Sequence, residues 1–401
     1  MAARPPSTVV TSSGGYKDRF WFMRFWNGMP VSVWLALMMR NRFQVGPLRI
    51  GMAFLTFISA VVNSLLGLVQ CMLLGRKIAR TKIEQQPIFI LGHWRTGTTL
   101  LHELLVLDPR HTFPDNYACF APSHFVLSRR VLAPMIQWMF PNRRPVDAMA
   151  LRWDSPQEDE FALCNLGARS PYLTMAFPNR PPQDQEYLTL EGLAAADSDR
   201  WKQTLLWFLK CITFRRPKRI VLKSPPHTGR VKALVEMFPD ARFVHIVRDP
   251  FVVFSSTVNL WKRLYKDEGF QTPRFEGLED HVFETLVQMY EAFERDRKLV
   301  PAGRFCEIRY EDLVADPIGQ MRRVYEELDL GGLEDALPVI ADHMKGQAGY
   351  RKNQYQIAPE LREEIARRWS GYIAKYGYAA RGEGNEERAT HRDTEKSKEP
   401  V

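Results

Sequence analysis

The sequence predicts an α/β fold, in which a P-loop-like parallel sheet flanked by helices forms a single catalytic domain with an N-terminal apolar helical extension. Three short apolar stretches are each followed by a polar loop and a helical pattern, the element order of parallel sheets. A charge-free stretch precedes them. The 401 residues are 45% hydrophobic and 25% charged, which excludes a globally disordered chain.

The charge-free stretch, residues 50–75, is longer than the roughly 20 residues needed to cross a bilayer. Arg49 precedes it, and Arg and Trp are mixed over residues 19–26, which suits a membrane interface. The alternative is a helix buried against the catalytic domain. Small or polar residues recur along one face and could pack on a partner helix: Thr56, Ser59, Asn63, Gly67 and Gln70.

The first strand, loop and helix are expected within residues 87–107. Gly92 and Gly97 have the spacing of a Walker A loop, but Thr98 and Thr99 replace its Lys-Ser/Thr pair. Arg95 places a cation inside the loop. Backbone N–H groups and a helix N-terminus would bind an anion there, so the loop indicates a nucleotide with an anionic 5′ group, but not ATP held with magnesium. A plain turn is the structural alternative.

Two further strands are expected at residues 219–223 and 242–247, and each ends in a cation, Lys223 and Arg248. Ligands of open parallel sheets bind at the carboxyl ends of the strands, so both cations should face the same crevice as the first loop. A surface lysine and an ion pair of Arg248 with Asp249 are the structural alternatives. Amphipathic helices that cover the sheet are expected at residues 318–329 and 359–376.

Three segments together resemble the hallmarks of PAPS-dependent sulfotransferases, where PAPS is 3′-phosphoadenosine 5′-phosphosulfate. They are Arg95–Thr99, the Arg248-Asp-Pro…Ser256 element and Ile308–Leu313, and their order and spacing match over residues 86–378. The chain is more similar to the Golgi and bacterial carbohydrate type and the tyrosylprotein type than to the cytosolic phenol and steroid type.

The resemblance implies PAPS as the donor and no metal. It implies that the 5′-phosphosulfate lies against the first loop, which comprises Arg95, Thr96, Gly97, Thr98 and Thr99. Arg248 and Ser256 match the pair that binds the 3′-phosphate, and Tyr310 matches a tyrosine near the nucleotide. Arg351 and Lys352 stand where the family has a late basic loop. Lys223 resembles the lysine of Lys-x-Pro segments and is assigned to the bridging oxygen and the sulfuryl group.

The general base has several candidates. Asp115 is favoured, because Golgi-type relatives keep a catalytic Glu near that offset, and its alternative is an Asx turn after Pro114. His227, four residues after Lys223, is a further choice. Glu158 is interpreted as the end of a capping box that starts at Ser155. Asp159 and Glu160 would then lie on the first turn of that helix, where they could face the acceptor, and His111 is assigned to a loop. The predicted catalytic set is Arg95, Asp115, Lys223 and His227.

The predicted organisation has four parts. A basic and aromatic segment spans residues 1–48, a candidate membrane anchor spans 49–76, the sulfotransferase domain spans 86–378 and a disordered charged tail spans 379–401. Membrane contact through residues 20–76 would make the protein membrane-associated with a cytoplasmic catalytic domain, and the alternative is a soluble cytoplasmic protein.

The expected partners follow from charge and resemblance. The net charge of +9 suits an anionic ligand, and no nucleic acid is expected. The acceptor is a hydroxyl-bearing small molecule, glycan or lipid, and the expected reaction is sulfuryl transfer by in-line displacement. The competing hypotheses are a P-loop kinase or NTPase, and a membrane-tethered scaffold that binds nucleotides without catalysis.

Overall fold

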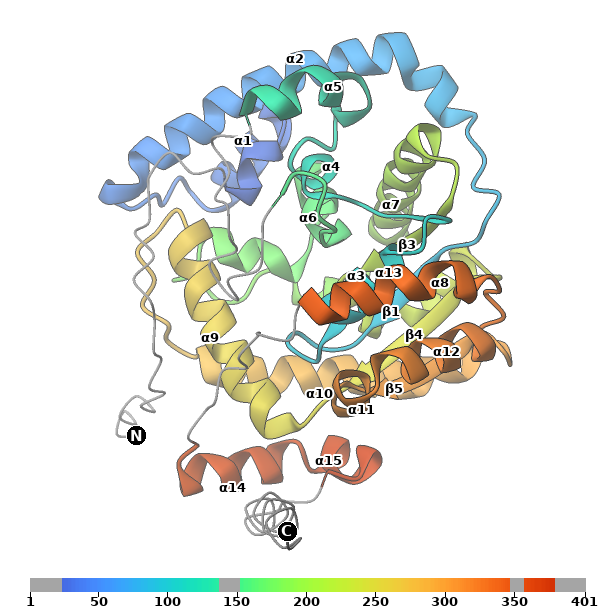
Figure 1. The fold of residues 1–401 in the computed structure, drawn as a ribbon. Coiled ribbons are helices and arrows are strands. Elements are labelled where there is room, and N and C mark those ends of the chain that lie inside the picture. Colours follow the sequence, from blue (N-terminus) through green and yellow to red (C-terminus); the bar gives the residue numbers. More distant parts are fainter. Residues whose placement is uncertain (1–23, 137–151, 347–356, 379–401) are drawn as a thin grey trace, which may run out of the picture.

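The computed structural model describes residues 24–136, 152–346 and 357–378, and Figure 1 shows a central sheet with helices on both faces. Three predictions fall outside the described residues: the N-terminal part of the basic and aromatic segment, the late basic loop with Arg351 and Lys352, and the charged tail.

The sheet has five parallel strands in the order β2-β3-β1-β4-β5. Their bounds are β1 Ile88–Leu91, β2 His111–Thr112, β3 Arg219–Lys223, β4 Arg242–Val247 and β5 Phe305–Arg309. Strand β1 lies between β3 and β4, with Ile90 opposite Lys223 and Leu91 opposite His245. The carboxyl ends of these three strands therefore meet at one edge, and the predicted fold class is confirmed. His111, expected in a loop, lies instead in the edge strand β2.

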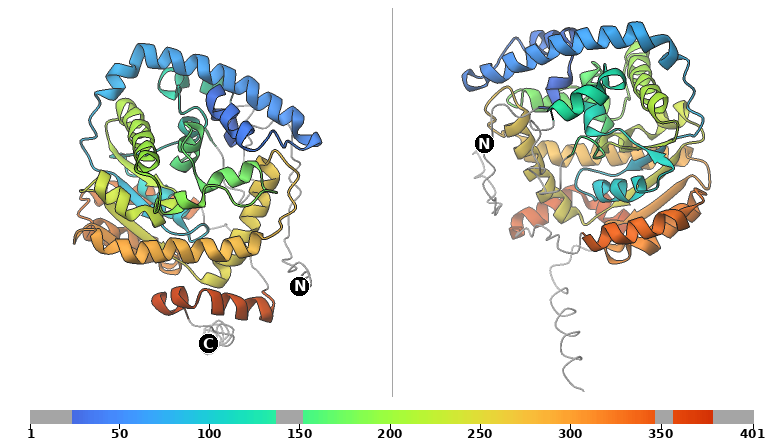
Figure 2. Two further views of the ribbon diagram at one scale, coloured as in Figure 1. Left: turned by 180° about the vertical axis from the view of Figure 1, so that it is seen from behind. Right: turned by 45° about the horizontal axis from the view of Figure 1, so that its top comes forward.

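The helices follow the predicted order and cover both sheet faces (Figures 1 and 2). In chain order they are α3 Thr98–Val106, α4 Asn116–Phe120, α5 Phe125–Ile136, α6 Asp159–Asn165, α7 Ala195–Arg215, α8 Val231–Met237, α9 Pro250–Glu268, α10 Leu278–Asp296, α11 Tyr310–Ala315, α12 Pro317–Glu327, α13 Leu333–Gly346, α14 Pro359–Arg368 and α15 Ser370–Tyr376. Side chains alternate across a strand, so Phe89 and Leu91 pack in one hydrophobic core, and Ile88 and Ile90 pack in the other.

The N-terminal extension packs along one side of the domain. A 3-10 turn, η1 Phe25–Gly28, leads to α1 Val31–Arg40 and then to the long helix α2 Ile50–Ala79, which lies across the top of Figure 1 above α5, α4 and α6. The segment Pro47–Ala79 is long and apolar enough to cross a membrane, but α2 lies on the domain instead of projecting from it.

Candidate active site

The first loop turns sharply between β1 and α3. Gly97 has φ +103°, a left-handed conformation that favours glycine, and a Cβ there would lie 2.2 Å from Cδ2 of Tyr310. Thr96 is buried and donates its hydroxyl to the His93 carbonyl oxygen at 2.7 Å, which closes the turn. Helix α3 begins at Thr98, so the loop leads directly into a helix N-terminus. The backbone N–H groups at such a terminus can bind an anion.

The loop is tied to the two neighbouring elements predicted for the donor. Nε of Arg95 donates to Oγ of Ser256 on α9 at 2.8 Å, and Nη1 of Arg248 donates to the carbonyl oxygen of Arg95 at 3.0 Å. The Arg248 guanidinium stacks 4.1 Å from the centroid of the Tyr310 ring. Since β1 and β4 are adjacent, residues from three distant parts of the sequence meet at one sheet edge.

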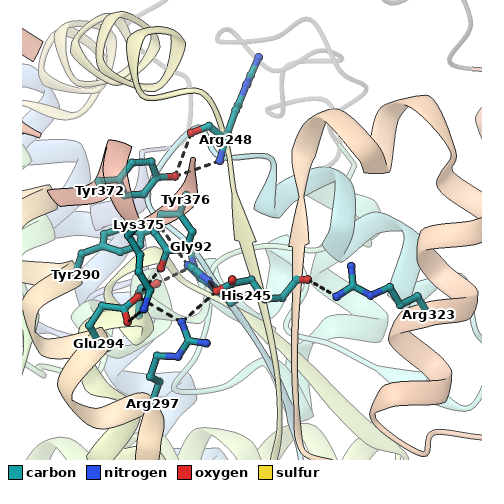
Figure 3. Close-up of polar contacts among 12 residues, drawn as sticks. Gly92, His245, Arg248, Tyr290, Glu294, Arg297, Arg323, Tyr372, Lys375 and Tyr376 are labelled. Carbon is teal, nitrogen blue, oxygen red and sulfur yellow. Dashed lines mark hydrogen bonds and ion pairs between the residues drawn. The ribbon is translucent and has the colours of Figure 1, made fainter. Parts of the chain in front are cut away.

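The C-terminal helix α15 fixes the backbone of Arg248. The Tyr372 hydroxyl accepts from the Arg248 N–H at 3.2 Å and donates to its carbonyl oxygen at 3.0 Å (Figure 3). Behind it, the Tyr376 hydroxyl donates to Glu294 at 2.7 Å, so α15 is also joined to α10. Tyr372 therefore holds the backbone of Arg248, while Tyr310 and the first loop position its guanidinium group.

The end of β3 carries an ion pair. Nζ of Lys223 donates to Oε1 of Glu158 at 2.6 Å, with 5% and 16% of the two side chains exposed. The second carboxylate oxygen of Glu158 accepts from the Tyr172 hydroxyl, which itself accepts from Nε1 of Trp94 at 3.0 Å. Burial and the Glu158 carboxylate raise the pKa of Tyr172 well above its usual value, so its hydroxyl stays a donor. Glu158 thus faces Lys223 beside the first loop.

Glu158 occupies this position because α6 begins at Asp159, three residues later than a capping box that starts at Ser155 would require. The residue before the helix is Glu158 itself, and its side chain makes no capping hydrogen bond. Oγ of Ser155 accepts from the backbone N–H of Arg152 at 3.3 Å instead. The predicted capping box of Ser155 and Glu158 is therefore wrong, and the carboxylate is directed toward β3.

The next two acidic residues are buried in pairs behind the site. Asp159 accepts from Nε2 of His227 at 2.7 Å and from Oγ of Ser224 at 2.8 Å. Burial opposes the charged form of Asp159, but His227 and Ser224 outweigh it and lower its pKa. Glu160 accepts two hydrogen bonds from Arg230, at 2.6 and 2.8 Å. The side chains of both pairs are fully buried, so neither pair faces solvent.

Asp115 is occupied by local structure. Its Oδ1 accepts from the N–H of Ala118 at 2.9 Å as the N-cap of α4, and its other oxygen pairs with Arg129. Burial raises its pKa in spite of the arginine. His111 is also buried and contacts the Leu105 carbonyl oxygen at 2.7 Å. Of the acidic and histidine candidates, the geometry therefore favours Glu158 over Asp115, His227 and His111.

Aromatic rings surround the Glu158 side of the site. Tyr172 lies between Trp94, Phe161 and Trp261, with ring centroids 5.0 to 6.2 Å away. Phe161 also stacks on Phe25 of η1 at 3.5 Å. These rings belong to the main hydrophobic core, so this side of the site is apolar. The run from Trp153 to Ala176 supplies Glu158, Phe161 and Tyr172, and its three consecutive acidic residues at 158–160 were the available sequence signal.

Comparisons with known proteins agree with this arrangement. A family model described as "Sulfotransferase family" matches residues 87–335. The omega-hydroxy-beta-dihydromenaquinone-9 sulfotransferases Stf3 of Mycobacterium bovis and Mycobacterium tuberculosis are each 48% identical to this chain over 360 residues, which are 90% of this chain and 92% of the relative.

Two solved structures share the fold. STF9 from Mycobacterium avium has a TM-score of 0.66 and 18% identity, covering 87% of this chain and 96% of that chain. STF1 from M. tuberculosis H37Rv has a TM-score of 0.63 and 20% identity, covering 84% and 90%.

Proposed function

Because the chain belongs to the sulfotransferase family, we propose that it transfers the sulfuryl group of PAPS to the hydroxyl of a lipid acceptor. The observation that carries the proposal is that the first loop, the pair Arg248 and Ser256, and the Lys223–Glu158 ion pair lie at one sheet edge. The family match favours this function over the kinase and scaffold hypotheses.

The residues at this edge fit the two anionic ends of PAPS. Loop residues 95–99 and the α3 N-terminus would hold the 5′-phosphosulfate, and the loop must contain glycine where the Tyr310 ring approaches Gly97. Arg248 and Ser256 would hold the 3′-phosphate by charge-assisted hydrogen bonds. Bound there, PAPS would supply the sulfuryl group and a phosphate leaving group.

We assign the acceptor side to the aromatic residues around Glu158. The curated relatives are named for a hydroxylated menaquinone, and at 48% identity over 90% of this chain a similar isoprenoid quinone is the favoured acceptor class. Rings such as Trp94, Phe161 and Trp261 suit an apolar molecule that carries a single hydroxyl. A glycan would need more polar partners than these rings provide.

The chain's own residues then divide the chemistry. Glu158 accepts the proton of the acceptor hydroxyl as the oxygen attacks sulfur, while Tyr172 holds the second carboxylate oxygen. Lys223, released from Glu158 by that proton, compensates the negative charge that grows on the departing phosphate oxygen. The acceptor oxygen gains the S–O bond that the phosphate loses, in line, and Glu158 returns its proton to water.

The test is to incubate the protein with radiosulfur-labelled PAPS and a lipid, glycan or protein extract. A separate reaction contains a hydroxylated menaquinone in place of the extract. Label should enter the lipid fraction and the hydroxylated quinone, and a quinone without the hydroxyl should stay unlabelled. Label in the glycan or protein fraction alone would reject the lipid acceptor. No transfer to any fraction by a protein that binds the desulfated product, PAP, would reject the enzyme proposal.

A further inference from the structure

Helix α2 is attached to the catalytic domain by its polar face. Nδ2 of Asn63 donates to the carbonyl oxygens of Asn27 and Met29 at 2.6 and 3.1 Å, and its Oδ1 contacts Nε2 of His124 at 3.0 Å. Gln70 donates to the Ser123 carbonyl oxygen at 2.9 Å and accepts from the backbone N–H of Leu127 at 3.0 Å. The stripe expected to meet a partner helix therefore meets backbone groups and the His124 side chain of this chain.

The opposite face of α2 is apolar and exposed along its whole length. These side chains, the apolar face, are Ile50, Phe54, Leu55, Ile58, Val61, Val62, Leu65, Leu68, Val69, Met72 and Leu73, with Leu48 just before them. Val131 and Met135 of α5, beside α2 in Figure 1, are exposed as well. An exposed apolar surface of this extent marks an interaction site.

The charge around the apolar face has one sign. Between residues 24 and 83 the sequence contains eight basic residues and no acidic one. Five of the basic residues are exposed at or near the two ends of α2: Arg42, Arg76, Lys77, Arg80 and Lys82. An apolar strip between basic ends is complementary to a bilayer that carries anionic headgroups.

We propose that α2 lies in the plane of an anionic membrane, with its polar face on the catalytic domain and its apolar face among the lipid chains. A spanning helix would have to carry Asn63 and Gln70 into hydrocarbon, away from five polar partners that they contact on the domain. A second copy of the chain would bring two sets of like charges together. The membrane is the occupant that satisfies both the apolar strip and its basic ends.

This orientation places the acceptor side of the site toward the membrane. Phe25 of η1 stacks on Phe161 of α6, η1 packs under α2, and Glu158 immediately precedes α6. A lipid acceptor would then approach Glu158 without leaving the membrane surface, and this step rests on the proposed function. The membrane contact of α2 does not rest on the proposed function, because its test uses neither PAPS nor an acceptor.

The first test is co-sedimentation of the full chain with vesicles of phosphatidylglycerol and phosphatidylcholine, compared with phosphatidylcholine alone. Binding should be stronger to the anionic vesicles. The double variant Leu65→Glu/Met72→Glu should bind about tenfold or more weakly, because two of the most exposed apolar side chains become charged. Leu299→Glu, an exposed leucine on η7 Arg297–Leu299, is the matched control and should bind like the parent.

Equal binding of the double variant and the parent would overturn the proposal, as would a parent that binds neither vesicle. A stable dimer by light scattering, abolished by the same double substitution, would show that a second copy covers the apolar face and would overturn it too. PAP affinity of the double variant should match that of the parent, which verifies its fold.

The second test separates a lying helix from a spanning one and does not depend on the glutamate variants. Cys71 is the one exposed cysteine of five, so a Cys71→Ser background allows nitroxide labels at Phe54→Cys, Leu65→Cys and Met72→Cys. A helix in the plane gives all three labels a similar depth from oxygen and nickel accessibility. A spanning helix places the central label about 10 to 16 Å deeper than the other two, from a rise of about 1.5 Å per residue, and this result would overturn the proposal.

Discussion

Replacing Glu158 by Gln tests the assignment of the general base. Glutamine keeps the size of the side chain and can still accept from the Tyr172 hydroxyl, but it cannot take a proton from the acceptor. A positioned general base contributes about 10²- to 10⁴-fold, or about 3 to 5 kcal/mol of activation free energy. The turnover number of Glu158→Gln should therefore fall by that factor.

The binding of PAP should respond differently. Glu158 pairs with Lys223 and touches neither the first loop nor Arg248 in the described contacts. Removal of its charge leaves the ammonium group of Lys223 free for a phosphate. PAP affinity measured by calorimetry should therefore stay the same or increase while turnover falls, which separates a chemical defect from a binding defect.

Asp115→Asn is the matched control, because asparagine still caps α4 but loses the charge that pairs with Arg129. Asp115→Asn should be less stable but keep turnover within about tenfold. If folded Asp115→Asn loses as much turnover as Glu158→Gln, or if Glu158→Gln is fully active, the argument for Glu158 fails.

Three further results are expected. Arg248→Ala should weaken PAP binding about tenfold or more by calorimetry, because it removes a charge-assisted phosphate contact. Tyr372→Phe removes both hydrogen bonds to the Arg248 backbone, so PAP binding should weaken by less than in Arg248→Ala, with about 1 to 2 kcal/mol lost in denaturant unfolding. Burial lowers the pKa of His124 from 6.5 to about 4, so the unfolded chain binds more protons between these values. Stability should fall by about 2 kcal/mol between pH 7 and pH 5 from this group, and His124→Gln should reduce that loss in urea titrations at the two pH values.

The donor side of the site was predictable because its signals are local. Gly97, Arg248 and Ser256 each lie just after a strand or early in the next helix, and parallel strand order alone brings their elements to one edge. The short strands at 219–223 and 242–247 were predicted with the same bounds. Their roles in binding PAPS stay predictions until the variants above are measured.

The acceptor side was not predictable in the same way. Glu158 and Lys223 are 65 residues apart, and nothing in either segment specifies the other. The Ser155-to-Glu158 spacing matches a capping box, and that local pattern masked the tertiary contact. For α2, the periodicity of the sequence revealed the polar stripe, but it could not identify the groups that the stripe contacts. Asn27 and Ser123 contribute backbone carbonyl oxygens, which every residue has.

The packing of the N-terminal segment argues against an anchor that can be removed without unfolding the domain. Trp26, Met29, Leu37, Met38 and Ile78 are all buried in the main hydrophobic core. At about 2 kcal/mol for each such side chain, their removal costs about 10 kcal/mol, which is comparable to the whole stability of a typical domain.

Deletion of residues 1–80 should therefore give an unfolded or aggregated protein, and not a soluble active enzyme. Deletion of residues 1–20, which ends before these contacts, is the control and should preserve PAP binding. The readouts are circular dichroism, unfolding temperature and PAP affinity. If the protein without residues 1–80 folds and transfers sulfate at the rate of the parent, α2 is a simple tether and the structural role argued for it is wrong.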